Sequence, residues 1–218
     1  MRRIDGKSSR LRGDAQRNRQ RILDAAREVF THSGVDVPMS AVARQAGVGV
    51  ATLYRRFPTR RDLVREVFAE RIETCSAVLG EALDDPDPWR GFCHVIEQVC
   101  ALQAAERGFT AAFLDTFPDA AADHSRHRLR GERGFAALVR RAQEAGSLRA
   151  DFHPSDLTVL LLANSALTTT PDPAAASRRL VALLLDACRA DAVRPPLPPP
   201  TGLDLGHVHP GGRPVPLE

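Results

Sequence analysis

The sequence lacks the short motifs by which most enzymes are recognised. Its 218 residues contain no G-x-S-x-G, no phosphate-binding loop and no G-x-G-x-x-G after a strand, and no acidic pair falls in a pattern typical of an active-site cleft. These absences argue against hydrolases, nucleoside triphosphatases and dinucleotide-dependent enzymes. We therefore expect no catalytic residues, no cofactor and no enzymatic activity.

Cysteine is also scarce. The four cysteines stand outside any C-x-x-C pair, which disfavours a structural zinc site. Cys93 and Cys100 fall on one face of a predicted helix, so the simplest interpretation is two buried apolar side chains. His124 and His127 are spaced like half a metal site but lack a third ligand nearby. We predict no metal site, and a metal- or thiol-responsive protein stays as an alternative.

Long apolar runs are missing as well. No stretch of eighteen apolar residues could span a membrane, and the Arg-rich first residues are not followed by the apolar segment of a signal peptide. We expect a protein with no membrane contact, located in a reducing cytoplasm.

Lysine is nearly absent, since Lys7 is the only one, and the arginines are unevenly distributed. Residues 1–63 contain fourteen Lys and Arg against six Asp and Glu, a net charge of +8, whereas residues 64–218 contain sixteen against twenty-one, a net of −5. A basic end attracts phosphates and releases the counterions condensed on DNA. The charge pattern therefore predicts a nucleic acid partner for the N-terminal end.

Apolar periodicity predicts three helices in this basic end, over residues 18–31, 41–46 and 50–57. Gly34 ends the first helix, and Ser40 is expected to cap the second with its hydroxyl. Gly47 supplies the left-handed residue at the end of the second helix. Two helices joined by so short a turn are typical of a helix-turn-helix.

A long fourth helix is predicted over residues 59–83. Pro58 ends the third helix, because the proline ring pushes Phe57 out of the helical region. Thr59 then caps the fourth helix, and Asp62 takes the place of the usual Glu or Gln in a capping box. Apolar residues recur at helical intervals along the segment, which indicates one amphipathic rod.

The rest of the chain also reads as helices, over residues 89–105, 108–117, 120–145, 155–167 and 174–190, with Ser155 as the cap of the fourth of these. The last two are apolar around much of their circumference, which favours a four-helix interface between two subunits. The predicted fold is all-α, with about nine helices. Its predicted parts are a disordered basic arm (1–16), a helix-turn-helix domain (17–63), a helical regulatory and dimerisation domain (64–192) and a disordered Pro-rich tail (193–218).

The segment GVGVATLYRRFPTRRDLV, preceded by RILDAAREVF, resembles the N-terminal domain of the TetR family of bacterial transcriptional regulators. The similarity covers about Arg17–Val67. The C-terminal helices, including Arg107-Gly108 and the connector GSLRAD, resemble the C-terminal domain of SbtR-like members. This resemblance implies a homodimer on a pseudo-palindromic double-stranded operator, and a body that binds a small-molecule effector.

The resemblance also implies which residues contact DNA. Base edges would face the start of the third helix, and phosphates would meet the remaining positions. The implied DNA-binding residues are Ser40, Val50, Ala51, Thr52, Tyr54, Arg55, Arg56, Thr59 and Arg60. Leu53 and Phe57, bulky and four apart, are expected in the core instead. The alternative for the arginines is an ordinary solvated surface.

Family resemblance places an effector inside the body, in a mostly apolar pocket. The candidate wall residues are Ile72, Phe92, Ile96, Cys100, Phe109, Phe113, Phe117, Leu161 and Asn164. For the apolar residues the alternative is plain core. Asn164 could anchor a ligand, pair across the dimer or lie on a wet edge. We expect an aromatic or lipid-like effector that releases a repressor from its operator, and a DNA-binding protein without an effector is a second alternative.

Overall fold

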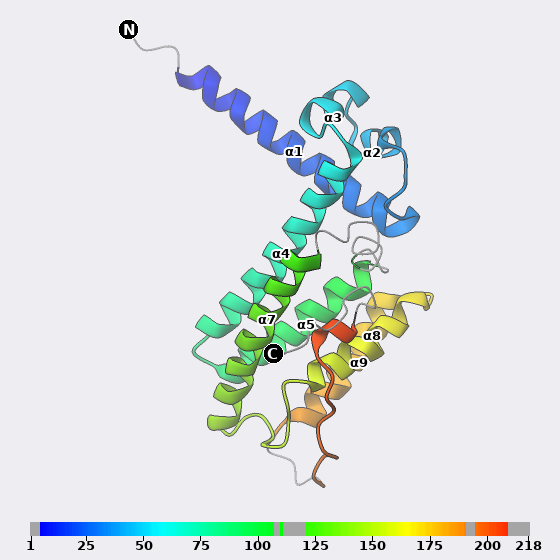
Figure 1. The fold of residues 1–218 in the computed structure, drawn as a ribbon. Helices are drawn as coiled ribbons and strands as arrows, with labels where there is room; N and C mark the ends of the chain where they lie inside the picture. The colour runs from blue at the N-terminus through cyan, green and yellow to red at the C-terminus, as the bar shows by residue number, and fades with distance from the viewer. Residues whose placement is uncertain (1–4, 107–109, 111–120, 191–194, 209–218) are drawn as a thin grey trace. The chain divides into compact units, whose positions relative to one another are not determined.

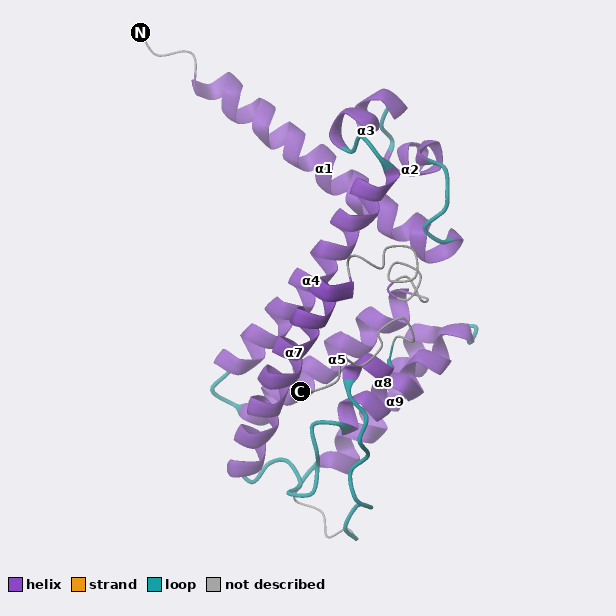
Figure 2. Cartoon of the chain, in the orientation of Figure 1, coloured by secondary structure: helices purple, strands orange, loops and turns teal. Residues whose placement is uncertain are grey.

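The computed structural model describes residues 5–106, 110, 121–190 and 195–208. These residues form eight α-helices, two 3-10 helices and one isolated bridge between Leu148 and Arg189, with no strand among them (Figures 1 and 2). The predicted all-α class is confirmed. The chain divides into two compact units, residues 1–71 and 72–218. The division falls inside the fourth helix, later than the predicted boundary after residue 63.

Unit 1 contains three helices and the first part of a fourth. They are α1 (Asp5–Ser33), α2 (Met39–Ala46), α3 (Val50–Arg56) and α4 (Arg60–Asp84). The apolar stripe of α1 is buried against α2, with Ile22, Ala26 and Phe30 each at most 2% exposed. Burial of this stripe explains why the segment forms a helix with one fixed face.

Helix α1 begins much earlier than the sequence pattern indicates. Its first residue is Asp5, so the prediction of a disordered arm over residues 1–16 is wrong for residues 5–16. Composition argued for disorder because this stretch is basic and has no apolar stripe. However, it contains no proline, and once a packed segment has nucleated a helix, each added residue needs only one further backbone hydrogen bond.

The turns of unit 1 follow the glycines. Gly34 has φ 78° and donates its N–H to the Phe30 carbonyl at 2.9 Å. Gly47 has φ 62°, and the next N–H, of Val48, reaches back to the Ala43 carbonyl at 3.0 Å. Both predicted helix ends are confirmed, because only glycine adopts this left-handed conformation without steric cost.

The predicted cap at Ser40 is wrong. Helix α2 starts at Met39, two residues earlier than predicted, with Pro38 as its N-cap and no side-chain hydrogen bond there. Pro38 has φ −61° and its carbonyl accepts from the Ala41 N–H at 2.9 Å, so the fixed proline ring supplies the start instead. Ser40 therefore lies in the first turn, exposed.

The start of α4 is the predicted capping box. The Asp62 carboxylate accepts from the Thr59 N–H at 3.1 Å and from its hydroxyl at 2.7 Å, while the Thr59 hydroxyl accepts from the Asp62 N–H at 3.1 Å. Phe57 has φ −129° and ψ 89°, outside the helical region, as expected before Pro58. These contacts fix where α3 ends and α4 begins.

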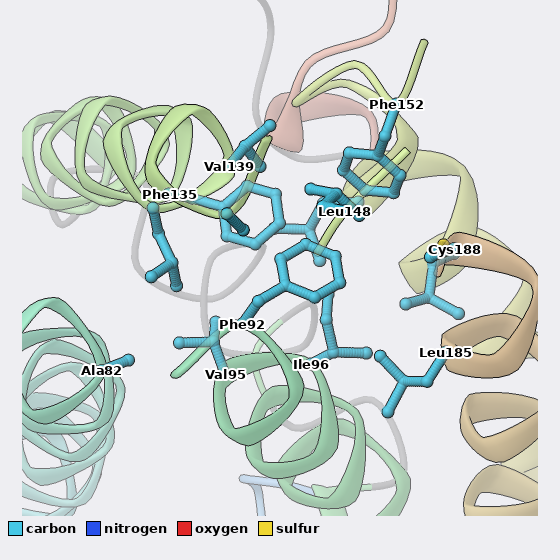
Figure 3. Close-up of a cluster of buried hydrophobic side chains, with 14 of the residues drawn as sticks. Ala82, Phe92, Val95, Ile96, Phe135, Val139, Leu148, Phe152, Leu185 and Cys188 are labelled. Atoms are coloured by element: carbon cyan, nitrogen blue, oxygen red, sulfur yellow. The ribbon is translucent and has the colours of Figure 1, made fainter. Parts of the chain in front are cut away.

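Unit 2 contains the rest of α4 and four further described helices. They are α5 (Pro88–Glu106), α7 (Ala121–Glu144), α8 (Asp156–Ala166) and α9 (Pro173–Cys188), with η2 (Leu167–Thr169) between the last two. Phe92 of α5 lies at the centre of the core (Figure 3). Its ring stacks with Trp89 at 5.6 Å and Phe135 at 5.9 Å, and meets Phe152 edge-on at 5.3 Å. The predicted helix 108–117 falls almost wholly outside the described residues.

Ser155 does not cap α8 as predicted. It occupies the N-cap position, but its hydroxyl lies 2.8 Å from His153 Nδ1 and makes no cap hydrogen bond. The Asp156 carboxylate accepts the His153 N–H at 2.9 Å. The turn thus satisfies its own polar groups locally, and these contacts compete with the cap.

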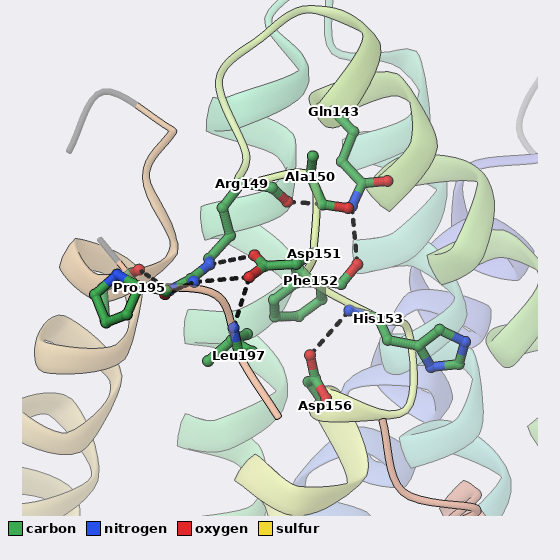
Figure 4. A network of polar contacts seen from close by, with 10 residues as sticks. Gln143, Arg149, Ala150, Asp151, Phe152, His153, Asp156, Pro195 and Leu197 are labelled. Carbon is green, nitrogen blue, oxygen red and sulfur yellow. Dashed lines mark hydrogen bonds and ion pairs between the residues drawn. The ribbon is translucent and has the colours of Figure 1, made fainter. Parts of the chain in front are cut away.

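The Pro-rich tail is partly ordered, which corrects the prediction of disorder over 193–218. Residues 195–208 lie along unit 2, with η3 (Leu205–His207) near their end (Figure 4). The Asp151 carboxylate, paired with Arg149 at 2.5 Å, accepts the Leu197 N–H at 2.8 Å. Leu205 packs on the core. Such anchors need no apolar periodicity, so the sequence pattern gave no sign of them.

Candidate nucleic-acid interface

Helix α3 is held by two apolar side chains and leaves its other side in solvent. Leu53 is 0% exposed and Phe57 is 5% exposed, which confirms the prediction that both belong to the core. Val50 and Tyr54 are 42% and 46% exposed, although both are large and apolar or aromatic. Because a seven-residue helix has one buried side, the anchor at Leu53 directs its remaining residues outward.

The nine predicted DNA-binding residues are near or at the surface of unit 1. Six of them belong to α3, Ser40 belongs to α2, and Thr59 and Arg60 begin α4. Thr52 is half-buried, and the other eight are exposed: Ser40, Val50, Ala51, Tyr54, Arg55, Arg56, Thr59 and Arg60. All nine are thus accessible or nearly so, and their contact with DNA stays a prediction.

The arginines of this surface differ in their partners. Arg55 donates to the Thr52 hydroxyl at 3.1 Å, which links two residues of the same helix. Arg60 faces the Asp36 carboxylate at 3.5 Å, an exposed pair that contributes little to stability. Arg56 is exposed and has no ion-pair partner among the described residues. Its charge is available to an anion from outside the chain.

Arg21 fixes the turn between α2 and α3, a role that the sequence analysis missed. Its Nη2 donates to the carbonyls of Ala46 at 2.7 Å and of Gly47 at 3.3 Å, where α2 ends. A Cβ on Gly47 would lie 3.1 Å from the same nitrogen. No spacing rule would have found this contact, because the residues are distant in sequence and the acceptors are backbone atoms.

A second missed group ties α1 to the beginning of α4. Arg19 pairs with Glu66 and lies 3.7 Å from Glu70, and Arg27 pairs with Glu70 at 2.7 Å. These ion pairs join side chains of α1 to side chains of α4. The scaffold that presents α3 is therefore held by polar contacts as well as by its core.

The predicted effector residues of unit 2 fall into three groups. Phe92, Ile96, Cys100 and Leu161 are buried in the core cluster, and Ile72 is half-buried on α4. Phe109, Phe113 and Phe117 lie outside the described residues. Burial in the core fits the alternative interpretation of the first group, and contact with a ligand stays a prediction.

Asn164 is 0% exposed, so the wet-edge alternative is wrong. Its Nδ2 donates to the Cys100 carbonyl at 3.1 Å and to Gln103 Oε1 at 2.8 Å. Its Oδ1 has no hydrogen-bond partner among the described residues. The nitrogen of the amide therefore makes its hydrogen bonds within one chain, while its oxygen makes none.

Two thiols of α5 are poorly suited to a redox switch. Burial raises the pKa of Cys93 to about 11, with a smaller contribution from Glu97. Burial alone raises the pKa of Cys100 to about 12. Since the thiolate is the reactive species, both side chains are weak nucleophiles at neutral pH. In the described part of the chain no three His, Cys, Asp or Glu side chains gather as a metal site would require.

A pocket of about 320 Å³ lies between α7, the start of α8 and the tail. Its wall includes Phe135, Leu157 and Leu203, with Arg133 and His153 among its polar residues. None of the predicted effector residues lines it. No described helix is both long and apolar enough to serve as a membrane span.

Comparison with known proteins finds a family match in each of the two units. The family model described as bacterial regulatory proteins of the tetR family matches residues 22–67, and that of the SbtR-like C-terminal domain of transcriptional regulators matches residues 87–190. An HTH-type transcriptional regulator of Staphylococcus aureus is 34% identical over 76 residues, which are 34% of this chain and 41% of the relative. The chain thus matches less than half the length of this curated relative.

Solved structures extend the similarity over both units. The TetR transcriptional regulator SCO0520 of Streptomyces coelicolor has a TM-score of 0.62 and 28% identity, covering 80% of this chain and 99% of its own. A TetR regulatory protein of Mycobacterium vanbaalenii has a TM-score of 0.61 and 29% identity, covering 82% and 99%. With family models on both units and the same architecture in solved relatives, the chain belongs to the TetR family of bacterial transcriptional regulators.

Proposed function

We propose that this protein is a dimeric repressor that binds a pseudo-palindromic operator through α3 and releases it when a small molecule binds unit 2. The observation that carries the proposal is the outward side of α3. There Val50 and Tyr54 are 42% and 46% exposed beside Arg55 and Arg56, while Leu53 is buried in the core and fixes the helix. A short basic helix presented in this way fits the major groove.

The residues of this surface suit two different tasks. Val50 and Ala51, at the start of α3, carry no hydrogen-bonding group and suit a thymine methyl or close approach to base edges. Tyr54 and Arg56 can reach phosphates, and Ser40 and Thr59 add hydroxyls at helix starts. Contacts of the second kind hold the protein in register on DNA, while those of the first kind select the sequence.

The dimer would form through α8 and α9. Val159 on α8 is 44% exposed and Leu183 on α9 is 62% exposed, although both side chains are apolar. An antiparallel or crossed pair of such helices from two copies would bury these residues in a four-helix interface. Two-fold symmetry would then double α3 and match the two halves of an operator.

The release mechanism would be a shift in population. Helix α4 is continuous from unit 1 into unit 2, so a ligand that favours one position of its C-terminal half would change the separation of the two α3 helices. Effector binding would then weaken the free energy of operator binding by about 1–3 kcal/mol, and operator binding must weaken effector binding by the same amount. Equal effector affinity with and without operator would contradict this mechanism.

The binding test uses fragments of the protein's own promoter region, footprinted and then titrated at several salt concentrations. We expect one protected two-fold site and a steep loss of affinity with salt. Arg56→Ala should weaken binding on all sequences and, because each subunit of the dimer loses one phosphate contact, reduce the magnitude of the slope of log K against log salt by about 1.8. Arg140→Ala, an exposed arginine of α7, is the matched control and should leave the slope unchanged.

Sequence choice is tested separately with Ala51→Leu. A larger side chain at the start of α3 should change the preferred bases without removing the salt dependence. An unchanged preference would remove Ala51 from the base-reading set. A protein that stays monomeric and protects no genomic fragment at physiological ionic strength would overturn the proposal as a whole.

A further inference from the structure

A small group of polar side chains lies buried between α5, α8 and α9. Gln103, Asn164 and Ser177 are 8%, 0% and 2% exposed, and Thr110 and Thr158 are the other buried polar side chains among the described residues. Asn164 and Ser177 meet at the carbonyl of Cys100, which accepts from Asn164 Nδ2 at 3.1 Å and more weakly from the Ser177 hydroxyl at 3.4 Å, and Gln103 joins them through Asn164. We refer to Cys100, Gln103, Asn164 and Ser177 as the polar cluster.

One acceptor of the polar cluster, Asn164 Oδ1, has no hydrogen-bond donor among the described residues. Both hydrogens of the Asn164 amide are used, one on the Cys100 carbonyl and one on Gln103 Oε1 at 2.8 Å. The amide oxygen has no donor among the described residues, although it is buried. Reversing the amide would place this oxygen against the Cys100 carbonyl, so the assignment follows from the acceptors around it. Buried carbonyl groups in native proteins nearly always have a partner.

We infer that the missing partner is the effector, and that the effector carries an uncharged hydrogen-bond donor, a hydroxyl or an amide N–H, which pairs with Asn164 Oδ1. The inference rests on the proposed function, in which a small molecule binds unit 2. A carboxylate, an ether or a ketone offers only acceptors, and it would leave Asn164 Oδ1 unpaired. A cation is disfavoured because the polar cluster contains no ionised side chain to balance it.

Gln103 strengthens the case for a hydroxyl or amide group. Its Oε1 is occupied by Asn164, and its Nε2 has no partner among the described residues. The two side chains together present one free acceptor and one free donor. A hydroxyl or a primary amide offers the complementary pair of groups.

The position of Asn164 would also connect ligand binding to the dimer. Asn164 belongs to α8, which also carries exposed Val159, whereas Cys100 and Gln103 belong to α5. A ligand bound to Asn164 Oδ1 would therefore touch the element that we assign to the subunit interface. Through α8 alone, effector binding could therefore change the spacing of the two subunits.

The test compares probes in pairs, one with a hydrogen-bond donor and one with every donor hydrogen replaced by a methyl group. We would measure calorimetric affinities and thermal shifts of the full chain with 1-octanol, 4-phenylbutan-1-ol and octanamide. Each probe is matched with its methylated form, which accepts but cannot donate: 1-methoxyoctane, 4-phenylbutyl methyl ether and N,N-dimethyloctanamide. We expect at least one donor-bearing probe to bind about tenfold more tightly than its methylated form, since an unpaired buried acceptor costs about that much. Octanoate should not bind.

Variants then assign the preference to Asn164. In Asn164→Leu the ratio of affinities within a pair should fall to about one, whereas Ser177→Ala, which removes the other donor to the Cys100 carbonyl, should keep it. If Asn164→Leu does not fold, the ratio measured on the wild-type chain still decides.

Three results would overturn the inference: equal binding of both members of every pair, binding of octanoate alone, or no binding by any probe. A high-resolution crystal structure with only an ordered water at Asn164 Oδ1 in the presence of a bound probe would overturn it as well. Operator footprinting is independent of all these measurements. The inference can therefore fail while the proposed repressor stands.

Discussion

Single carboxylates set several local features of this protein, and Asp62 is the clearest. Its three hydrogen bonds with Thr59 hold the first turn of α4, immediately after the helix proposed to bind DNA. We expect Asp62→Ala to lower the free energy of unfolding by about 1 kcal/mol, as loss of an N-terminal cap usually does. Urea unfolding followed by circular dichroism measures this change.

Asp62→Asn is the matched control for that variant. An asparagine oxygen can still accept from the Thr59 N–H, so most of the stability should remain. Equal losses in the two variants would show that the charge of Asp62, and not its cap geometry, matters.

The contacts of Asp151 with Arg149 and Leu197 should be sensitive to acid. Hydrogen bonds from Arg149, and then from the Leu197 N–H, lower the pKa of the Asp151 carboxyl from 3.8 to about 2. A lowered pKa in the folded state means that the contribution of this group is complete above pH 3.8 and is lost as the pH falls toward 2. Asp151→Asn should therefore flatten the pH dependence of the melting temperature in this window.

Arg149→Gln removes the same pair from the other side and should flatten the profile in the same way. The readout is a series of thermal melts between pH 2 and pH 5. A profile of Asp151→Asn that follows the wild type throughout would show that the contact between Asp151 and the tail contributes nothing to stability.

At the scale of the helix, close approach of α4 and α5 depends on one glycine. A Cβ built on Gly91 would lie 2.5 Å from the Ala82 carbonyl oxygen, a backbone atom that cannot rotate away. Gly91→Ala should force the two helices apart and lower the free energy of unfolding by about 1–3 kcal/mol, the usual cost of overpacking. Chemical denaturation of the full chain measures it.

Gly80 on the same α4 provides the control. A Cβ there meets nothing within 4 Å, and the residue is exposed. Gly80→Ala should stabilise the protein by up to about 1 kcal/mol through helix propensity. A similar loss in both variants would contradict the proposed role of the α4–α5 contact.

Sequence patterns predicted the helices well but their first residues less well. The ends at Gly34 and Gly47 and the start at Thr59 were confirmed, because each depends on neighbouring residues in the chain. The caps at Ser40 and Ser155 were wrong, because Pro38 and His153 supplied competing local contacts. A polar residue before a helix is a common cap, but it does not exclude another solution.

For the whole molecule, the decisive prediction concerns assembly. Leu183 is 62% exposed on α9, the surface assigned to the dimer. Leu183→Glu would bury an unpaired charge in that interface, at a cost of roughly 3–5 kcal/mol, and the dimer should dissociate. We expect a monomer in analytical ultracentrifugation and a loss of operator binding, with unchanged helicity.

Leu129→Glu is the matched control, since Leu129 is 41% exposed on α7, outside the assigned interface. It should remain dimeric and bind operator normally. If Leu183→Glu also remains dimeric, the interface does not lie on that side of α9.

The sequence by itself determined the helical class, the basic N-terminal end, the short turn between α2 and α3 and the capping box of α4. These features depend on composition and on residues a few positions apart, so a linear pattern carries them. Only the tertiary structure decided that Arg21 holds the turn, that residues 195–208 pack on the helices of unit 2, and that Asn164 has an unpaired oxygen in the core. Each of these depends on groups brought together from distant parts of the chain, often on backbone atoms, which leave no trace in the spacing of side chains.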